Sequence, residues 1–196
     1  MLLEIVSTCG LDAHCYMPNT GYPDVCGSVA DFLSREQGVA VEGTDVLMTC
    51  GAAGALNVAL KALLDRDDEV ITPVPCFVEY KFYANNHGGV LQTVPSTSNF
   101  QLDLPALRAA ITPRTKVVLI NSPNNPTGAV YSAESLQALG EILEAKGREY
   151  SRTIYLISDE PYRKVVYDGV TVPSIFTAYR ESIIGTSYSK DISIPG

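Results

Sequence analysis

The segment KVVLINSPNNPTG, residues 116–128, joins an apolar run to a turn in the way that a parallel α/β sheet requires. Residues 116–120 are rich in β-branched side chains without polar alternation, so they predict a strand covered on both faces. The Asn, Pro and Gly residues at 121–128 predict a rigid turn. A helix is predicted over 132–146, with Ser132 as a candidate cap and with one apolar stripe formed by Leu136, Leu139 and Leu143. A strand, a turn and a helix that covers the sheet therefore follow one another.

The same alternation of apolar runs and helical patterns extends along the chain and is typical of parallel α/β architecture. The predicted strands are residues 45–49, 69–72, 90–94, 116–120, 154–158 and 182–186. The predicted helices are residues 27–36, 53–64, 78–86, 104–110 and 132–146. We therefore expect a three-layer α/β/α fold with a mainly parallel sheet of six or seven strands. The sequence shows no repeat, low-complexity tract or linker, so residues 1–196 are assigned to one domain.

Composition and charge argue against several classes of function. The chain of 196 residues is 46% hydrophobic and 18% charged, which indicates a globular protein, and its formal net charge of −8 disfavours nucleic acid or a membrane surface as a partner. Its five cysteines form no Cys-x-x-Cys pair, and with two histidines no metal-ligand spacing is present, so no metal is expected. The first residues lack the pattern of a signal peptide, and a cytoplasmic location is expected.

Ligands of open α/β sheets bind beyond the carboxyl ends of the strands, so the loops at those ends are the most informative. Four of them carry notable residues: 51–56, 121–128, 158–162 and 187–191. Small residues at 51–56 open a helix and let an anion approach its first N–H groups, which favours phosphate binding. Taken alone, each loop also has an ordinary structural explanation: tight packing, a connecting turn, a capping or ion-paired aspartate, and a solvated lysine.

In their order and spacing, these loops resemble those of the class I/II aminotransferases, which are fold-type I enzymes that depend on pyridoxal 5′-phosphate (PLP). The motifs that carry the resemblance are Asn-Pro-Thr-Gly at 125–128, Asp-Glu-Pro-Tyr at 159–162 and Ser-Tyr-Ser-Lys at 187–190. It extends from residue 14 to residue 196. It implies a PLP-binding large domain of an enzyme, of aspartate type, that transfers an amino group between an amino acid and a 2-oxo acid.

The resemblance implies a role for each matching polar residue. Lys190 matches the lysine that holds the cofactor as a Schiff base and shuttles a proton between Cα and C4′. Asp159 matches the acid that pairs with the pyridine nitrogen, where a carboxylate keeps the ring protonated and able to accept electrons. Asn125 and Tyr162 match two hydrogen-bond donors to the phenolic oxygen. Lys190, Asp159 and Tyr162 are therefore the predicted catalytic residues.

Further residues match the contacts to the phosphate and to the ring face. The N–H groups of Ala52 and Ala53 and the hydroxyl group of Ser187 match phosphate ligands. Phe77 stands where the family places an aromatic ring stacked on the cofactor. Tyr16 resembles the tyrosine that reaches the phosphate of the neighbouring subunit, so the resemblance implies a homodimer.

The sequence departs from the family pattern at both ends. It stops at Gly196, just before the position of an arginine that pairs with the cofactor phosphate. The N-terminal arm and the small C-terminal domain are missing as well, so we expect part of a longer enzyme. Two alternatives are a PLP-dependent lyase of the same fold, because fold does not fix reaction type, and a truncated module without catalytic activity. The resemblance also leads us to expect a cis bond at Asn125–Pro126.

Overall fold

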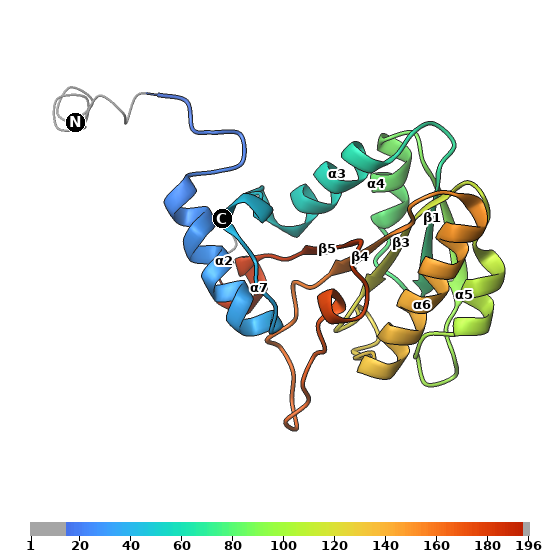
Figure 1. Cartoon of the computed structure of the whole chain (residues 1–196). Helices are drawn as coiled ribbons and strands as arrows, with labels where there is room; N and C mark the ends of the chain where they lie inside the picture. The colour runs from blue at the N-terminus through green and yellow to red at the C-terminus, as the bar shows by residue number, and fades with distance from the viewer. Residues whose placement is uncertain (1–14, 194–196) are drawn as a thin grey trace, which may run out of the picture. The chain divides into compact units, whose positions relative to one another are not determined.

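The structure is a computed structural model that describes residues 15–193 (Figure 1). The chain divides into two compact units, one that ends at Met48 and one that begins at Thr49. The first unit contains helix α2 (Pro23–Gln37), which starts at a proline and ends at Gly38 with a left-handed φ of 70°. A proline suits the first position of a helix because its missing N–H has no helical partner there. The helix predicted at 27–36 is confirmed, and it begins about one turn earlier.

The strand predicted at residues 45–49 is wrong. The chain forms a short 3₁₀ helix, η2 (Gly43–Asp45), and residues 46–49 have no strand partner among the residues that the structure describes. Val46 is buried against Cys26 and Ala30 of α2. Its apolar character therefore reflects packing on a helix, which a short apolar run cannot distinguish from burial in a sheet.

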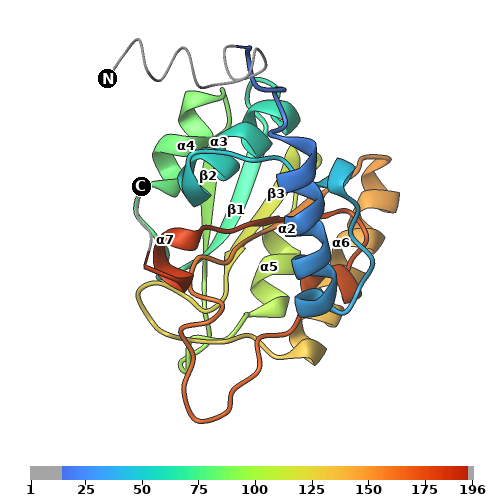
Figure 2. The ribbon, with the colours of Figure 1, turned by 90° about the vertical axis from the view of Figure 1, so that its left-hand side faces the viewer.

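The second unit is built on a parallel sheet with the strand order β2-β1-β3-β4-β5. The strands are β1 (Glu69–Val74), β2 (Val90–Pro95), β3 (Thr115–Asn121), β4 (Tyr155–Asp159) and β5 (Ser182–Gly185). Figure 2 shows β2, β1 and β3 side by side in that order. Each strand overlaps a predicted one, so the parallel α/β class is confirmed. The described part of the chain contributes five strands to this sheet, where six or seven were predicted.

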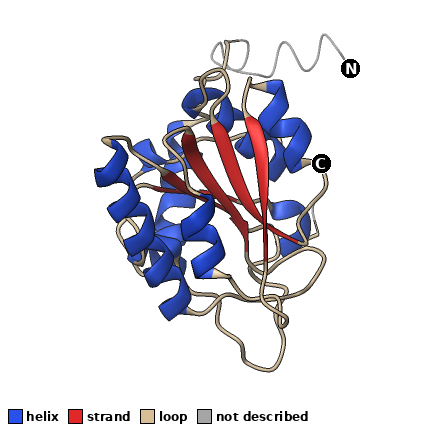
Figure 3. Ribbon diagram, turned by 90° about the vertical axis from the view of Figure 1, so that its right-hand side faces the viewer, coloured by secondary structure: helices blue, strands red, loops and turns tan. Residues whose placement is uncertain are grey.

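Helices cover both faces of the sheet, as Figure 3 shows with the strands in red between helices in blue. On one face lie α3 (Gly51–Leu63) and α4 (Tyr80–Asn86), and on the other lie α5 (Leu104–Ala110) and α6 (Ala133–Tyr150). The interior strands β1, β3 and β4 are buried along almost their whole length. The predicted three layers are confirmed, because runs without polar alternation form strands covered on both sides.

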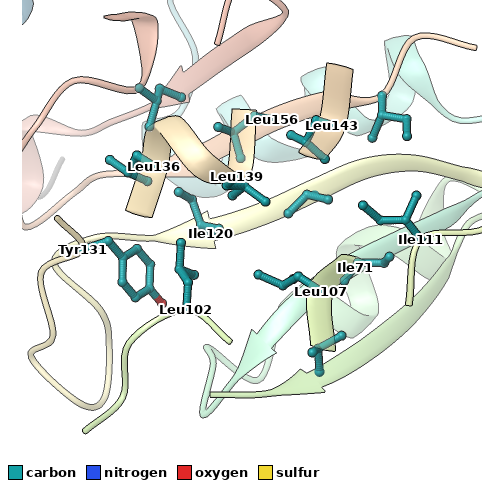
Figure 4. Packing of buried hydrophobic residues seen from close by; sticks show 14 residues of the cluster. Ile71, Leu102, Leu107, Ile111, Ile120, Tyr131, Leu136, Leu139, Leu143 and Leu156 are labelled. Carbon is teal, nitrogen blue, oxygen red and sulfur yellow. The ribbon is translucent and has the colours of Figure 1, made fainter. Parts of the chain in front are cut away.

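Alternate residues of the interior strands point to opposite faces and divide the core in two. The cluster under α5 and α6 is labelled in Figure 4 and includes Ile71, Ile120, Leu136, Leu139 and Leu143. The cluster under α3 and α4 includes Leu56, Leu60, Val70, Tyr80, Val117 and Leu119. Val70 and Ile71 are successive residues of β1 that serve different clusters, as the period of two along a strand requires.

The longest helix, α6, begins as its sequence predicts. Ser132 is its cap, and the Ser132 hydroxyl group accepts a hydrogen bond of 3.2 Å from the N–H of Ser135. The helix ends at Tyr150, beyond the predicted end at residue 146. Within residues 15–193, no helix is both long enough and apolar enough to cross a membrane.

Replacing Gly140 of α6 by alanine is expected to destabilise the protein by about 1–2 kcal/mol. An added Cβ would lie 2.4 Å from the carbonyl oxygen of Ala178, which follows the 3₁₀ helix η3 (Ile175–Thr177). Displacing this backbone costs more than the gain of up to about 1 kcal/mol that alanine brings to a helix. Urea unfolding checks the expectation.

The control for Gly140→Ala is Gly27→Ala in α2, where an added Cβ meets no atom within 4 Å. This control is expected to keep or raise stability, because only the helix propensity changes. If Gly140→Ala were as stable as the wild type, the backbone at Ala178 would be able to move away from the added Cβ without loss of stability.

Candidate active site

The carboxyl ends of neighbouring parallel strands meet at one edge of the sheet, and polar contacts join them there. Asn121, at the end of β3, pairs in register with Asp159 at the end of β4, which pairs with Gly185 at the end of β5. The Asn121 side-chain amide donates a hydrogen bond of 2.7 Å to the carbonyl oxygen of Asp159. The N–H of Glu160 donates one of 2.7 Å to the carbonyl oxygen of Gly185. The loops that leave these strands therefore start from fixed and adjacent positions.

The turn after β3 is held by the two side chains of Asn121 and Asn124. Asn121 Oδ1 accepts a hydrogen bond of 2.5 Å from the N–H of Asn125, and Asn124 Nδ2 donates one of 3.4 Å to the carbonyl oxygen of Pro75 in the loop after β1. The expected cis bond at Asn125–Pro126 is confirmed. Asn125, the predicted donor to the cofactor, is half-buried in this turn. The turn is rigid, as the sequence indicated, and it is tied to a second loop of the same edge.

Asp159 is the most unusual residue of this edge because it is a buried acid with no cation beside it among residues 15–193. Its residue surface is only 6% exposed, and Oδ2 accepts a hydrogen bond of 2.6 Å from the hydroxyl group of Tyr80. Oδ1 is buried and has no hydrogen-bond partner in the described part of the chain. Burial raises the pKa of the Asp159 carboxyl group to about 6, although the hydrogen bond from Tyr80 lowers that pKa. Buried polar atoms normally have a hydrogen-bond partner, so Oδ1 is an acceptor that a bound ligand with an N–H or O–H group could satisfy.

Tyr162 lies in the turn that follows Asp159, and it is half-buried. An ion pair fixes this turn: Arg163 Nη1 lies 2.8 Å from Glu160 Oε2, and both side chains are almost fully buried. Arg163 Nη2 also donates a hydrogen bond of 2.7 Å to the carbonyl oxygen of Val172, where the loop returns. The ion pair and the hydrogen bond of Arg163 therefore hold the turn, and with it Tyr162, beside the end of β4.

Ser187 and the start of α3 come together, although more than a hundred residues separate them. A Cβ built on Gly51 would lie 3.6 Å from Ser187 Oγ, and Gly51 has a left-handed φ of 69° that favours glycine. Cys50, the residue before α3, makes no side-chain cap hydrogen bond, so the first N–H groups of this helix, including those of Ala52 and Ala53, are not capped by it. A hydroxyl group therefore stands beside the positive end of a helix, which is a suitable arrangement for an anion.

Lys190 lies on α7 (Tyr188–Asp191), a short helix after β5 that Ser187 caps with a hydrogen bond of 3.1 Å from the N–H of Ser189. The Lys190 side chain is exposed, and residues 15–193 show no ion pair or hydrogen bond to its ammonium group. The next residue, Asp191, lies 3.8 Å from Lys164 Nζ and so connects α7 with the loop after β4. Lys190 thus lies at the same edge of the sheet, and within the described part of the chain its amine has no partner.

Phe77 and Tyr16 are the remaining predicted residues. Phe77 is half-buried in the loop after β1, and its ring meets the ring of Tyr80 edge-on at 5.7 Å between centroids. Tyr16 is fully exposed in the unit that ends at Met48, and its predicted role across subunits stays a prediction.

Sequence reasoning did not identify Tyr80 and Asn121 as residues of this edge. In the sequence, Tyr80 is indistinguishable from the other apolar residues of a predicted helix. Its partner Asp159 is 79 positions away, so no local pattern indicates the contact. Asn121 stands in the predicted turn, but its contacts to Asn125 and Asp159 depend on strand register. Only the position of Asn121 at the end of an apolar run could have indicated its role.

Comparisons with known proteins agree with this geometry. The sequence model of a family described as aminotransferase class I and II matches residues 10–196. The aspartate aminotransferase of Geobacillus stearothermophilus is 38% identical over 187 residues, which cover 92% of this chain and 46% of that protein. A probable aspartate aminotransferase of Methanocaldococcus jannaschii is 36% identical over 153 residues, which cover 78% of this chain and 39% of that protein.

Solved structures give the same result. The crystal structure of an amino transferase from Eubacterium rectale superposes with a TM-score of 0.92 at 40% identity, covering 100% of this chain and 50% of that one. The aromatic aminotransferase of Pyrococcus horikoshii superposes with a TM-score of 0.84 at 28% identity, covering 92% and 48%. This chain spans about half the length of the relatives that it matches.

Proposed function

This chain belongs to the class I and II aminotransferase family, and we propose that it forms the PLP-binding core of an enzyme that transfers an amino group between an amino acid and a 2-oxo acid. The observation that carries the proposal is the buried carboxyl group of Asp159, with Oδ2 bound by Tyr80 and Oδ1 unpaired among the described residues. The protonated ring nitrogen of PLP is both a cation and an N–H donor, so it offers what Oδ1 lacks. The residues of this edge therefore fit the cofactor.

The phosphate of the cofactor fits the start of α3. The N–H groups of Ala52 and Ala53 and the hydroxyl group of Ser187 are the proposed ligands, supported by the contact between Gly51 and Ser187. Uncapped N–H groups and the helix dipole favour a dianion without a cationic side chain. Phe77 would cover one face of the ring.

When bound, PLP supplies an aldehyde that takes up the amino group and a ring that withdraws electrons from the reacting carbon. Lys190 provides the amine that holds the aldehyde covalently at rest and then moves a proton at the α-carbon of the substrate. Asp159 keeps the ring nitrogen protonated through Oδ1. Asn125 and Tyr162 donate hydrogen bonds to the phenolic oxygen and stabilise its negative charge.

The proposed substrate is aspartate, which is supported by the names of the curated relatives. Absorbance spectra of the protein with PLP, before and after addition of aspartate, alanine or an aromatic amino acid, test the function. We expect a band of bound cofactor that shifts on addition of aspartate, with release of a 2-oxo acid. Release of ammonia in place of net amino transfer would indicate a lyase, and failure to retain PLP would contradict the proposal.

We also propose that the protein acts as a cytoplasmic homodimer in which Tyr16 of each subunit contributes to the phosphate site of the other. The full exposure of Tyr16 is compatible with this arrangement, because it leaves the side chain accessible to a partner subunit. Light scattering is expected to give twice the mass of one chain. A monomer with full affinity for PLP would refute the shared site.

A further inference from the structure

Tyr80 stands between two residues that the proposed function assigns to the cofactor. It is the first residue of α4 and is fully buried in the cluster under α3 and α4. Its hydroxyl group donates to Asp159 Oδ2 at 2.6 Å, and its ring meets the Phe77 ring edge-on. The ring of Tyr80 is thus anchored in the core, while its hydroxyl group reaches the edge of the sheet.

We propose that Tyr80 is a positioning residue, which fixes Asp159 through Oδ2 so that Oδ1 faces the ring nitrogen of the bound cofactor. The inference rests on the proposed function and adds a residue to it. A carboxyl group on a short side chain rotates about its last bond, so its two oxygens exchange places unless one of them is held. One strong O–H···O⁻ bond to a buried phenol removes this freedom.

The surroundings of the pair make this single bond important. Apart from Asp159, the titratable groups that act on Tyr80 are the thiol of Cys76 and the phenol of Tyr131, both of which are neutral near pH 7 because burial raises their pKa values. Among the described residues, no cation shares the charge of Asp159. Without the hydroxyl group of Tyr80, both carboxylate oxygens would be buried and unpaired, which strongly disfavours the ionised form that the cofactor needs.

The test compares Tyr80→Phe with Tyr83→Phe. Tyr83 lies one turn along the same helix and donates its hydrogen bond to Glu79, so its replacement removes a phenol oxygen but leaves Asp159 untouched. The first readout is a carbon-13 titration of the Asp159 carboxyl group without cofactor. The pKa of Asp159 is expected to rise by roughly one to two units in Tyr80→Phe and to stay unchanged in Tyr83→Phe.

The second readout is the affinity for two probes, PLP and its analogue with carbon in place of the ring nitrogen. Tyr80→Phe is expected to bind PLP about 10-fold more weakly, with the affinity for the analogue unchanged, because only PLP uses Asp159. Tyr83→Phe is expected to bind both probes like the wild type.

An equal loss for both probes, or an unchanged pKa of Asp159, would show that Tyr80 is only a core side chain and would overturn the inference. If the wild type binds neither probe, the proposed function fails and the inference falls with it. Should Tyr80→Phe not fold, 3-fluorotyrosine at position 80 replaces it as the test. Its hydroxyl group is a stronger donor and must lower the pKa of Asp159, and an unchanged pKa would again refute the inference.

Discussion

Replacing Lys190 by alanine is expected to abolish the covalent attachment of PLP and to slow amino-group transfer by about 10²- to 10⁴-fold. The variant lacks the amine that we propose both reacts with the aldehyde and moves a proton at the α-carbon. The fold should be unaffected, because the Lys190 side chain is exposed and makes no ion pair with the described residues. Single-turnover absorbance changes after addition of aspartate to the PLP-loaded protein measure the rate.

The control for Lys190→Ala is Lys81→Ala, which removes an exposed lysine from α4. Its rate and its spectrum with PLP are expected to match those of the wild type. If Lys190→Ala kept the wild-type rate while Lys81→Ala lost it, the assignment of the catalytic amine would be wrong.

Replacing Asp159 by asparagine is expected to lower amino-group transfer by at least about 10²-fold and to weaken PLP binding. An amide carries no negative charge and cannot hold the ring nitrogen in its protonated form. Asparagine keeps the size of the side chain and an oxygen for the hydroxyl group of Tyr80, so the loss reports on charge. The same spectra and single-turnover rates measure it, and an unimpaired variant would contradict the role of Asp159.

In the absence of cofactor, the same substitution should remove a destabilising effect that the Asp159 carboxylate has on the folded protein above pH 6. The folded-state pKa of Asp159 is about 6, above its ordinary value of 3.8, so the ionised form is the unfavourable one in the folded protein. The folded state binds more protons than the unfolded state between these pH values, and stability falls as pH rises through this window. The resulting cost above pH 6 is about 3 kcal/mol.

Asp159→Asn removes this dependence. The free energy of unfolding of the variant, relative to the wild type, is expected to shift by about 2.5 kcal/mol in favour of the variant between pH 4 and pH 8, because part of the full cost is already present at pH 4. Urea unfolding at the two pH values gives this difference, and a constant cost of the buried amide cancels in the comparison. If the difference in free energy of unfolding did not change with pH, the pKa of Asp159 would not be raised in the folded protein, and this account would be wrong.

Much of the fold could be predicted because pattern and burial agree. The run at 116–120 forms β3, the helix at 104–110 has the predicted bounds, and Leu136, Leu139 and Leu143 are buried on α6. The error at 45–49 arose where Val46 packs on a helix, since apolar character alone does not reveal which partner covers it. The order of the strands is a property of long-range pairing, which local patterns do not contain.

The site was predictable as a set of loops and less so as a set of contacts. The acid and the lysine stand in motifs whose spacing the sequence shows directly. The hydrogen bond from Tyr80 to Asp159 and the approach of Ser187 to Gly51 join segments that are distant along the chain. Such contacts depend on register and on helix placement, so only the folded structure reveals them.

The most direct measurement of the central claim is the position of the covalent adduct after PLP and borohydride treatment of the wild-type chain. Peptide mass spectrometry is expected to find the modification on Lys190, with the nearby Lys164 and the other lysines unmodified at equimolar PLP. An adduct on Lys164, or one spread over the surface lysines, would contradict the proposal that this edge of the sheet is a PLP site centred on Lys190.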